Sequence, residues 1–157
     1  MFPLLENRKP LERLTLQVRG SSAPTIDLFL RVIAECPRLS TLIQSGKASL
    51  LERALQAGAW TDAALAATNL EIPAWSVRRL VSEDGEWLCS LTRQQQMPTE
   101  FDDTVDAYHE CLPLAILGAL IEVRRKGSGA HAGSSLGHRM PRVAASPEIA
   151  ACCDNFA

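Results

Sequence analysis

The chain has 157 residues, a length that fits a single domain. It is 46% hydrophobic and 22% charged, as folded globular proteins are. The formal net charge is −2, so the whole molecule has no strong field that would attract nucleic acid or an anionic membrane. The longest apolar run, residues 111–121, is far shorter than the roughly 20 residues of a spanning helix. We therefore expect no membrane span and no nucleic-acid function driven by overall charge.

The cysteines and the N-terminus both favour a reducing compartment. The sequence contains 5 cysteines, an odd number, and no Cys-x-x-Cys pair occurs among them. Disulfide-stabilised domains normally carry an even set of spread cysteines. In residues 1–9 the charges follow the apolar residues, the reverse of a secretory signal. The sequence predicts a cytoplasmic protein with reduced thiols.

The N-terminal half is predicted to be mainly helical. Residues 24–70 contain apolar positions at helical spacing, and Pro37 should end the first helix of this region. Further helices are predicted over about 47–57 and 62–70. Residues 10–19 alternate like a strand but also fit a helical stripe, and periodicity leaves both alternatives open.

A β-hairpin is the clearest local signal. Two runs rich in strand-forming residues, 75–81 and 87–92, flank an Asp84-Gly85 pair, a combination typical of a hairpin turn. A two-residue loop would place Glu83 opposite Glu86, an unfavourable pairing of like charges.

A three-residue loop avoids that pairing. With Gly85 in a left-handed conformation, it sets Val81 opposite Trp87 and Val77 opposite Leu91. The apolar side chains of the hairpin then share one face: Trp75, Val77, Val81, Trp87, Cys89 and Leu91. We predict this register.

Residues 102–126 are predicted to be a final helical region, interrupted at Pro113, which fits the first turn of a second helix. That helix is apolar most of the way round over residues 114–123, so we expect it to be buried on more than one side. Residues 127–157 are rich in small and turn-forming residues and lose the apolar period, which predicts a disordered tail.

These elements predict an α+β fold with a helical N-terminal half, a helix–β-hairpin–helix module and a disordered C-terminal tail. A single domain spans residues 1–126, with the helical part over about 1–58 and the module over about 59–126. Two strands alone are marginally stable in water, so the hairpin must pack on the final helix or gain strands from elsewhere.

Within residues 59–123 a family resemblance can be stated. The segment has a short helix at Ala59-Trp60-Thr61-Asp62, a hairpin closed by Asp84-Gly85-Glu86-Trp87, and a helix at Leu114-Ala115-Ile116-Leu117-Gly118-Ala119-Leu120. This order resembles the small α-β-β-α sandwich domains of phage-derived proteins. The resemblance implies a fold and no established activity.

No motif for catalysis, cofactor binding or metal binding stands out. His109 is the only histidine before the predicted tail, and on a helix it would lie beside Asp106 and Glu110. A histidine that pairs with a carboxylate explains this group better than a metal site, which needs three or four ligands. Cys89 and Cys111 lie in apolar surroundings, which favours inert thiols over nucleophiles. We therefore predict no catalytic, cofactor or metal residues.

The function that these observations favour is that of a non-catalytic accessory or interaction protein. Its partner would be another protein or a second copy of the chain. The predicted interaction surface is the set Arg78, Arg79, Trp75 and Trp87, because Trp and Arg are frequent interface anchors. One alternative is a nucleic-acid-associated protein that uses the hairpin arginines with Arg93 and residues 124–126. The weakest alternative is an enzyme centred on His109.

Overall fold

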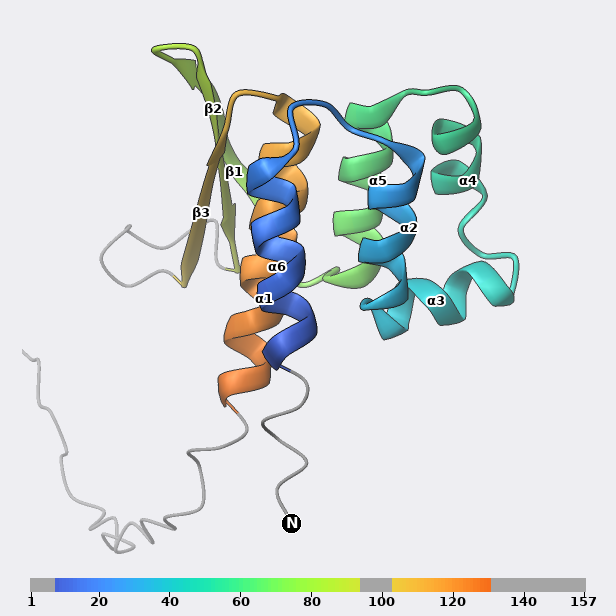
Figure 1. The fold of residues 1–157 in the computed structure, drawn as a ribbon. Helices are drawn as coiled ribbons and strands as arrows, with labels where there is room; N and C mark the ends of the chain where they lie inside the picture. The colour runs from blue at the N-terminus through green and yellow to red at the C-terminus, as the bar shows by residue number, and fades with distance from the viewer. Residues whose placement is uncertain (1–7, 94–102, 131–157) are drawn as a thin grey trace, which may run out of the picture.

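The computed structural model describes residues 8–93 and 103–130. Within them the chain forms an α+β fold of six helices and one three-stranded antiparallel sheet, which confirms the predicted fold class. The sheet lies at one side of the molecule, with α6 packed against it, α1 packed on α6, and α2 to α5 farther from the sheet (Figure 1). None of the helices in the described ranges combines the length and apolar character needed to cross a bilayer.

Five helices make up the N-terminal half: α1 (Arg8–Gly20), α2 (Ile26–Ala34), α3 (Pro37–Gln44), α4 (Ser49–Gln56) and α5 (Trp60–Glu71). Residues 10–19, left open between strand and helix, belong to α1. Their helical stripe of Leu11, Leu14 and Val18 is buried. Packing of this stripe therefore favours the helix over the strand, a choice that periodicity alone leaves open. Pro37 separates α2 from α3 and occupies the first turn of α3, where its missing N–H has no cost.

The sheet contains β1 (Ser76–Glu83), β2 (Glu86–Thr92) and β3 (Thr104–His109), in the order β1-β2-β3. The predicted hairpin is confirmed as β1 and β2. The prediction of helix at the start of 102–126 is wrong, because residues there form the third strand. That strand gives β2 a second neighbour, which a marginal two-stranded hairpin needs.

The hairpin turn is tighter than predicted. Asp84 and Gly85 alone form the loop, with φ values of 53° and 85°. Two positive φ angles are typical of the two-residue turn that matches strand twist, so the left-handed Gly85 is confirmed and the three-residue loop is wrong. Glu83 lies directly opposite Glu86. The twist preference of an Asp-Gly turn therefore outweighs the repulsion between two exposed carboxylates.

A β-bulge explains the rest of the register. Val77 lies opposite Leu91, as predicted, but the pairing then shifts at Arg78. The predicted pairing of Val81 with Trp87 is wrong by one residue. Between the bulge and the turn, Leu80 lies opposite Cys89 and takes the place on the buried face that was predicted for Val81. Val81 lies opposite Leu88 on the other face, so its predicted position on the apolar face is wrong, whereas the bulge keeps Val77 on that face.

Helix α6 (Leu112–Ala130) is the centre of the fold. Pro113 lies in its first turn, as predicted. The large apolar side chains over residues 114–123 are buried, as expected for a helix that is apolar most of the way round. One side of α6 packs on β2 and β3 and another on α5 and α1. The helix continues past residue 126, so the predicted tail begins inside it, and residues 131–157 lie outside the described part of the chain.

A buried carboxylate links three helices away from the sheet. Glu71, at the end of α5, accepts a hydrogen bond from the Leu39 N–H at the start of α3, at 2.8 Å. The other oxygen of the same carboxylate lies 3.3 Å from Arg124 Nε on α6. Arg38 adds a bond from Nε to the Leu70 carbonyl, at 2.9 Å. We call Glu71, Leu39 and Arg124 the Glu71 cluster.

From α5 to α6 the order of elements is α-β-β-β-α. This is one strand more than the α-β-β-α order of the resemblance, and the extra strand is β3.

Candidate functional site

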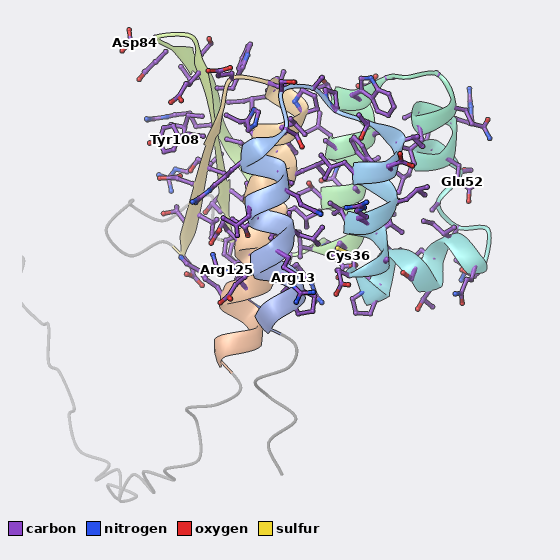
Figure 2. All side chains as sticks on the ribbon, viewed as in Figure 1. Arg13, Cys36, Glu52, Asp84, Tyr108 and Arg125 are labelled. Atoms are coloured by element: carbon purple, nitrogen blue, oxygen red, sulfur yellow. The ribbon has the colours of Figure 1, made fainter. Side chains whose placement is uncertain are left out.

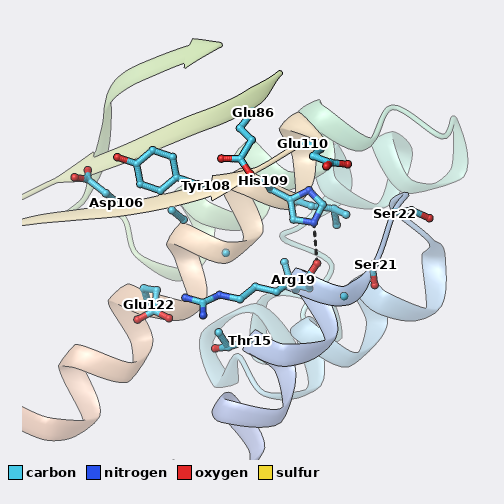
Figure 3. Close-up of a pocket in the computed structure, with 15 residues that line it drawn as sticks. Thr15, Arg19, Ser21, Ser22, Glu86, Asp106, Tyr108, His109, Glu110 and Glu122 are labelled. Carbon is cyan, nitrogen blue, oxygen red and sulfur yellow. Dashed lines mark hydrogen bonds between the residues drawn. The ribbon is translucent and has the colours of Figure 1, made fainter. Parts of the chain in front are cut away.

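A groove of about 630 Å³ lies between α1, β3 and α6 (Figure 3). Three parts of the chain supply most of its lining: residues 15–22 at the end of α1, residues 106–110 in and after β3, and one side of α6. We call it the β3 groove. It is the place where segments from both ends of the described chain meet, so we take it as the candidate site.

Small side chains allow the three elements to approach each other beneath the groove. A Cβ atom added at Gly118 of α6 would lie 3.4 Å from the Ala107 Cβ of β3 and 4.0 Å from Val18 Cγ1 of α1. An added Cβ would therefore make ordinary van der Waals contacts there, so α6 lies within side-chain contact of β3 and α1 at Gly118.

His109 joins β3 to α1 at one end of the groove. Its Nε2 lies 3.0 Å from the Val18 carbonyl, the bond drawn as a dashed line in Figure 3. Its Nδ1 accepts the Cys111 N–H at 2.9 Å, which requires Nδ1 to be unprotonated, so Nε2 carries the proton and donates it. Both ring nitrogens are thus used in holding backbone together. The expected helical arrangement of His109 with Asp106 and Glu110 is wrong, since Asp106 and His109 belong to a strand.

The backbone of β3 presents one unpaired edge to the groove. The Arg93 N–H donates to the Asp103 carbonyl at 3.3 Å, so residues 103, 105, 107 and 109 form the hydrogen-bonded pairs with β2. The N–H and C=O groups of Thr104, Asp106 and Tyr108 then point away from β2. Lys126 donates to the Thr104 carbonyl at 2.9 Å and covers that end of the edge.

Asp106 and Tyr108 are the exposed centre of this edge. Within 8–93 and 103–130, no hydrogen bond reaches their outward backbone groups. Both residues line the groove. Tyr108 is 60% exposed and projects from the sheet on the side away from the helices (Figure 2). The β3 groove therefore offers two N–H and two C=O groups at strand spacing.

The lining of the groove is negatively charged. The residues that line it include the acidic Glu86, Asp106, Glu110 and Glu122 and one basic residue, Arg19. Glu122 is partly neutralised by Arg125, at 2.8 Å. The groove would therefore attract positively charged groups.

Two buried thiols lie outside the groove. Burial, together with a smaller effect of the nearby carboxylates of Glu71 and Asp106 respectively, raises the pKa of Cys36 and of Cys89 to about 12 each. A thiol with so high a pKa stays protonated and is a poor nucleophile or metal ligand. Among the described residues, no group of three His, Cys, Asp or Glu side chains is arranged to hold a metal ion.

The four residues of the predicted interaction surface are divided between different environments. Arg78, at the bulge, and Arg79, opposite Ser90, are both exposed on β1. Trp75 and Trp87 are half-buried and pack against the hydrophobic core. Trp87 lies in the row that also contains His109 of β3, on the helix-facing side of the sheet.

The basic residues at the end of α6 point to different partners. Arg124 contacts Glu71, Arg125 contacts Glu122 and Lys126 contacts Thr104. These bonds lead to α5, to α6 itself and to β3, so the three side chains do not form one basic face.

A second groove, of about 660 Å³, lies between α4 and α5 and is lined mainly by alanine and leucine side chains. Leu50 on its rim is 72% exposed. This surface lacks the backbone hydrogen-bonding groups that distinguish the β3 groove.

A scan of protein-family models and searches of curated proteins and of solved structures found no match to this chain.

Proposed function

We propose that this protein is a non-catalytic interaction module that binds an extended segment of a partner protein along β3. The observation that carries the proposal is that the outward backbone groups of Asp106 and Tyr108 have no hydrogen-bond partner among residues 8–93 and 103–130 and lie beside an open groove. Extended peptides commonly add to such an edge as a further strand, with main-chain hydrogen bonds supplying affinity. The function requires no catalytic group.

The opposite edge of the sheet is less suited to this role. Strand β1 is bulged at Arg78 and carries a second exposed arginine, Arg79, next to it. Bulges and long charged side chains are the usual devices by which proteins prevent pairing at a sheet edge. Strand β3 pairs with β2 over six residues without a bulge. The regular edge is thus the one that faces the groove.

The enzyme alternative has less support. His109 uses both ring nitrogens for backbone hydrogen bonds, so neither is available for proton transfer without breaking a bond. The nucleic-acid alternative is also weakened, because Arg124 and Arg125 pair with carboxylates of this chain. A groove lined by carboxylates would repel a phosphate backbone.

A proline scan of β3 tests the proposal. Tyr108→Pro removes an outward N–H and no bond to β2, so the sheet should survive, as edge strands tolerate proline. Ala107→Pro removes a bond to β2 and should unfold the sheet. Tyr108→Ala is the matched control, because it removes the phenol ring and keeps the N–H.

The probe is a peptide selected on the full chain from a random-peptide display library and measured by fluorescence anisotropy. We expect the Tyr108→Pro variant to keep the circular dichroism spectrum of the unchanged protein and to bind the peptide about tenfold more weakly or worse. Tyr108→Ala should reduce the peptide affinity less, because it keeps the N–H. A selected peptide that binds the folded Tyr108→Pro variant as tightly as the unchanged protein would overturn the proposal, and so would a selection that yields no binder.

A cytoplasmic location is part of the same proposal. It is supported by Cys36, Cys89 and Cys111, which are all unpaired thiols. Unpaired thiols are typical of reducing compartments.

A further inference from the structure

We infer that the segment bound along β3 is basic, with two Lys or Arg residues four positions apart and an apolar residue midway between them. This inference rests on the proposed function and specifies the chemistry of its partner. It comes from the side chains around the free edge, whereas the function itself comes from the backbone.

Three of the acidic side chains around the groove are exposed to solvent. They belong to Glu86, Asp106 and Glu110, and none has an ion pair with any residue in 8–93 or 103–130. Glu86 also lies directly opposite Glu83, and like charges at paired positions destabilise a sheet. These residues therefore leave negative charge uncompensated at the mouth of a groove, where a cationic ligand would relieve it.

The geometry of a strand sets the spacing. On the face of the sheet away from the helices, β3 presents Asp106 and then Tyr108, and Glu86 and Glu110 follow at the turn end (Figure 3). In an added strand, side chains two residues apart lie on the same face. One basic side chain would lie near Asp106, an apolar one against the Tyr108 ring, and a second basic one near Glu86 and Glu110.

A second copy of this chain fits the groove poorly. Pairing two β3 edges would bring Asp106 and Glu110 of one copy close to the same carboxylates of the other. The cost of that repulsion favours a different, basic protein as the partner.

Three synthetic peptides test the inference: the sequence Thr-Lys-Thr-Val-Thr-Lys-Thr, and its versions with Gln or Glu in place of both Lys. The termini are acetylated and amidated, so that only the side chains differ in charge. We expect the Lys peptide to bind about tenfold more tightly than the Gln peptide, and the Glu peptide to bind weakest. The advantage of Lys should shrink as salt is raised, because exposed charges are screened.

Protein variants locate the effect. Asp106→Asn and Glu86→Gln should each reduce the ratio of Lys-peptide to Gln-peptide affinity. Glu52→Gln is the control, since Glu52 is an exposed carboxylate on α4, on the far side of the molecule (Figure 2). It should leave the ratio unchanged.

The outcomes separate the inference from the function on which it rests. If the three peptides bind equally and Tyr108→Pro abolishes all binding, the function stands and the basic partner is wrong. If the Lys peptide binds equally well to the Tyr108→Pro variant, or if no peptide binds, the added strand itself is wrong. A Lys preference that Glu52→Gln reduces as much as Asp106→Asn would also overturn the inference, because it would reflect overall charge alone.

Discussion

Removing the Glu71 carboxylate should destabilise the fold more than removing any exposed charge. The Glu71 side chain is only 2% exposed, accepts a hydrogen bond from Leu39 N–H and forms an ion pair with the Arg124 guanidinium. In Glu71→Ala, α3 loses the acceptor at its N-terminus, a change that typically costs about 1 kcal/mol. Arg124 loses its carboxylate, and breaking a buried pair from one side costs about 3–5 kcal/mol. Since the Arg124 side chain is 28% exposed and water can reach it, we expect about 3–4 kcal/mol in total.

Urea denaturation followed by tryptophan fluorescence measures this cost. Glu71→Gln is the first control, because it keeps an acceptor for Leu39 N–H while losing the charge, and it should cost about half as much. Glu122→Ala is the second, because its pair with Arg125 is more exposed, and it should cost less than about 1 kcal/mol. If Glu71→Ala unfolds at the same urea concentration as Glu122→Ala, the Glu71 cluster does not hold the helices together as we argue.

Two further predictions concern Trp87 and Cys89 on the sheet and Cys36 at the start of α3. Trp87→Ala should cost about 2–4 kcal/mol, since the ring is half-buried against the core, and an unchanged urea midpoint would instead place Trp87 among the binding residues. The pKa of Cys36 and Cys89 is raised from 9.0 to about 12, so the folded state holds these protons more tightly than the unfolded state. Their contribution to stability is complete below about pH 9 and is lost as the pH rises towards 12, by about 1.4 kcal/mol per pH unit for each thiol. In Cys89→Ala the free energy of unfolding should decline less steeply between pH 9 and 11 than in the unchanged protein. If the two slopes are identical, the pKa of Cys89 is not raised in the folded state.

Local sequence signals predicted most of the helices and the hairpin. The helix α2 and the position of Pro113 at the start of α6 follow from helical spacing alone, and both are confirmed. The face that α2 buries differs from the apolar stripe at 26, 29, 30 and 33, because Ile26 and Leu30 are exposed. The α1 segment was ambiguous because a short amphipathic stretch fits both periods. Its contacts with α6, far away in the sequence, decide in favour of the helix.

Strand β3 was missed because its local signals favour a helix start. Asp103 and Thr104 are typical of helix N-termini, and they precede a long apolar helix. The alternative signal was present: Val105 and Ala107 alternate with Asp106 and Tyr108, as in a half-exposed strand. Pairing with β2 over six residues outweighs the local preference, and no single-segment pattern contains that information.

The β3 groove could not be predicted for the same reason. It needs His109 to reach the Val18 carbonyl, a contact between residues 91 positions apart. It also needs β3 as a strand, because the outward direction of the Asp106 and Tyr108 backbone depends on which residues pair with β2. Because the β3 residues are predicted to be helical, the sequence does not predict the groove, although it contains each of the acidic residues that line it.

The bulge at Arg78 connects the register to the proposed function. An Asp-Gly turn favours a two-residue loop, and with a regular ladder that loop would place Val77 opposite Thr92, on the face of the sheet away from the helices. One extra residue at Arg78 restores Val77 to its position opposite Leu91, so the bulge reconciles the turn with the core. The same extra residue interrupts the outer edge of β1 and leaves two arginines exposed there. The bulge that the turn requires thus also makes the β1 edge unsuited to pairing, which is why we propose the regular edge of β3 as the one to which another chain adds.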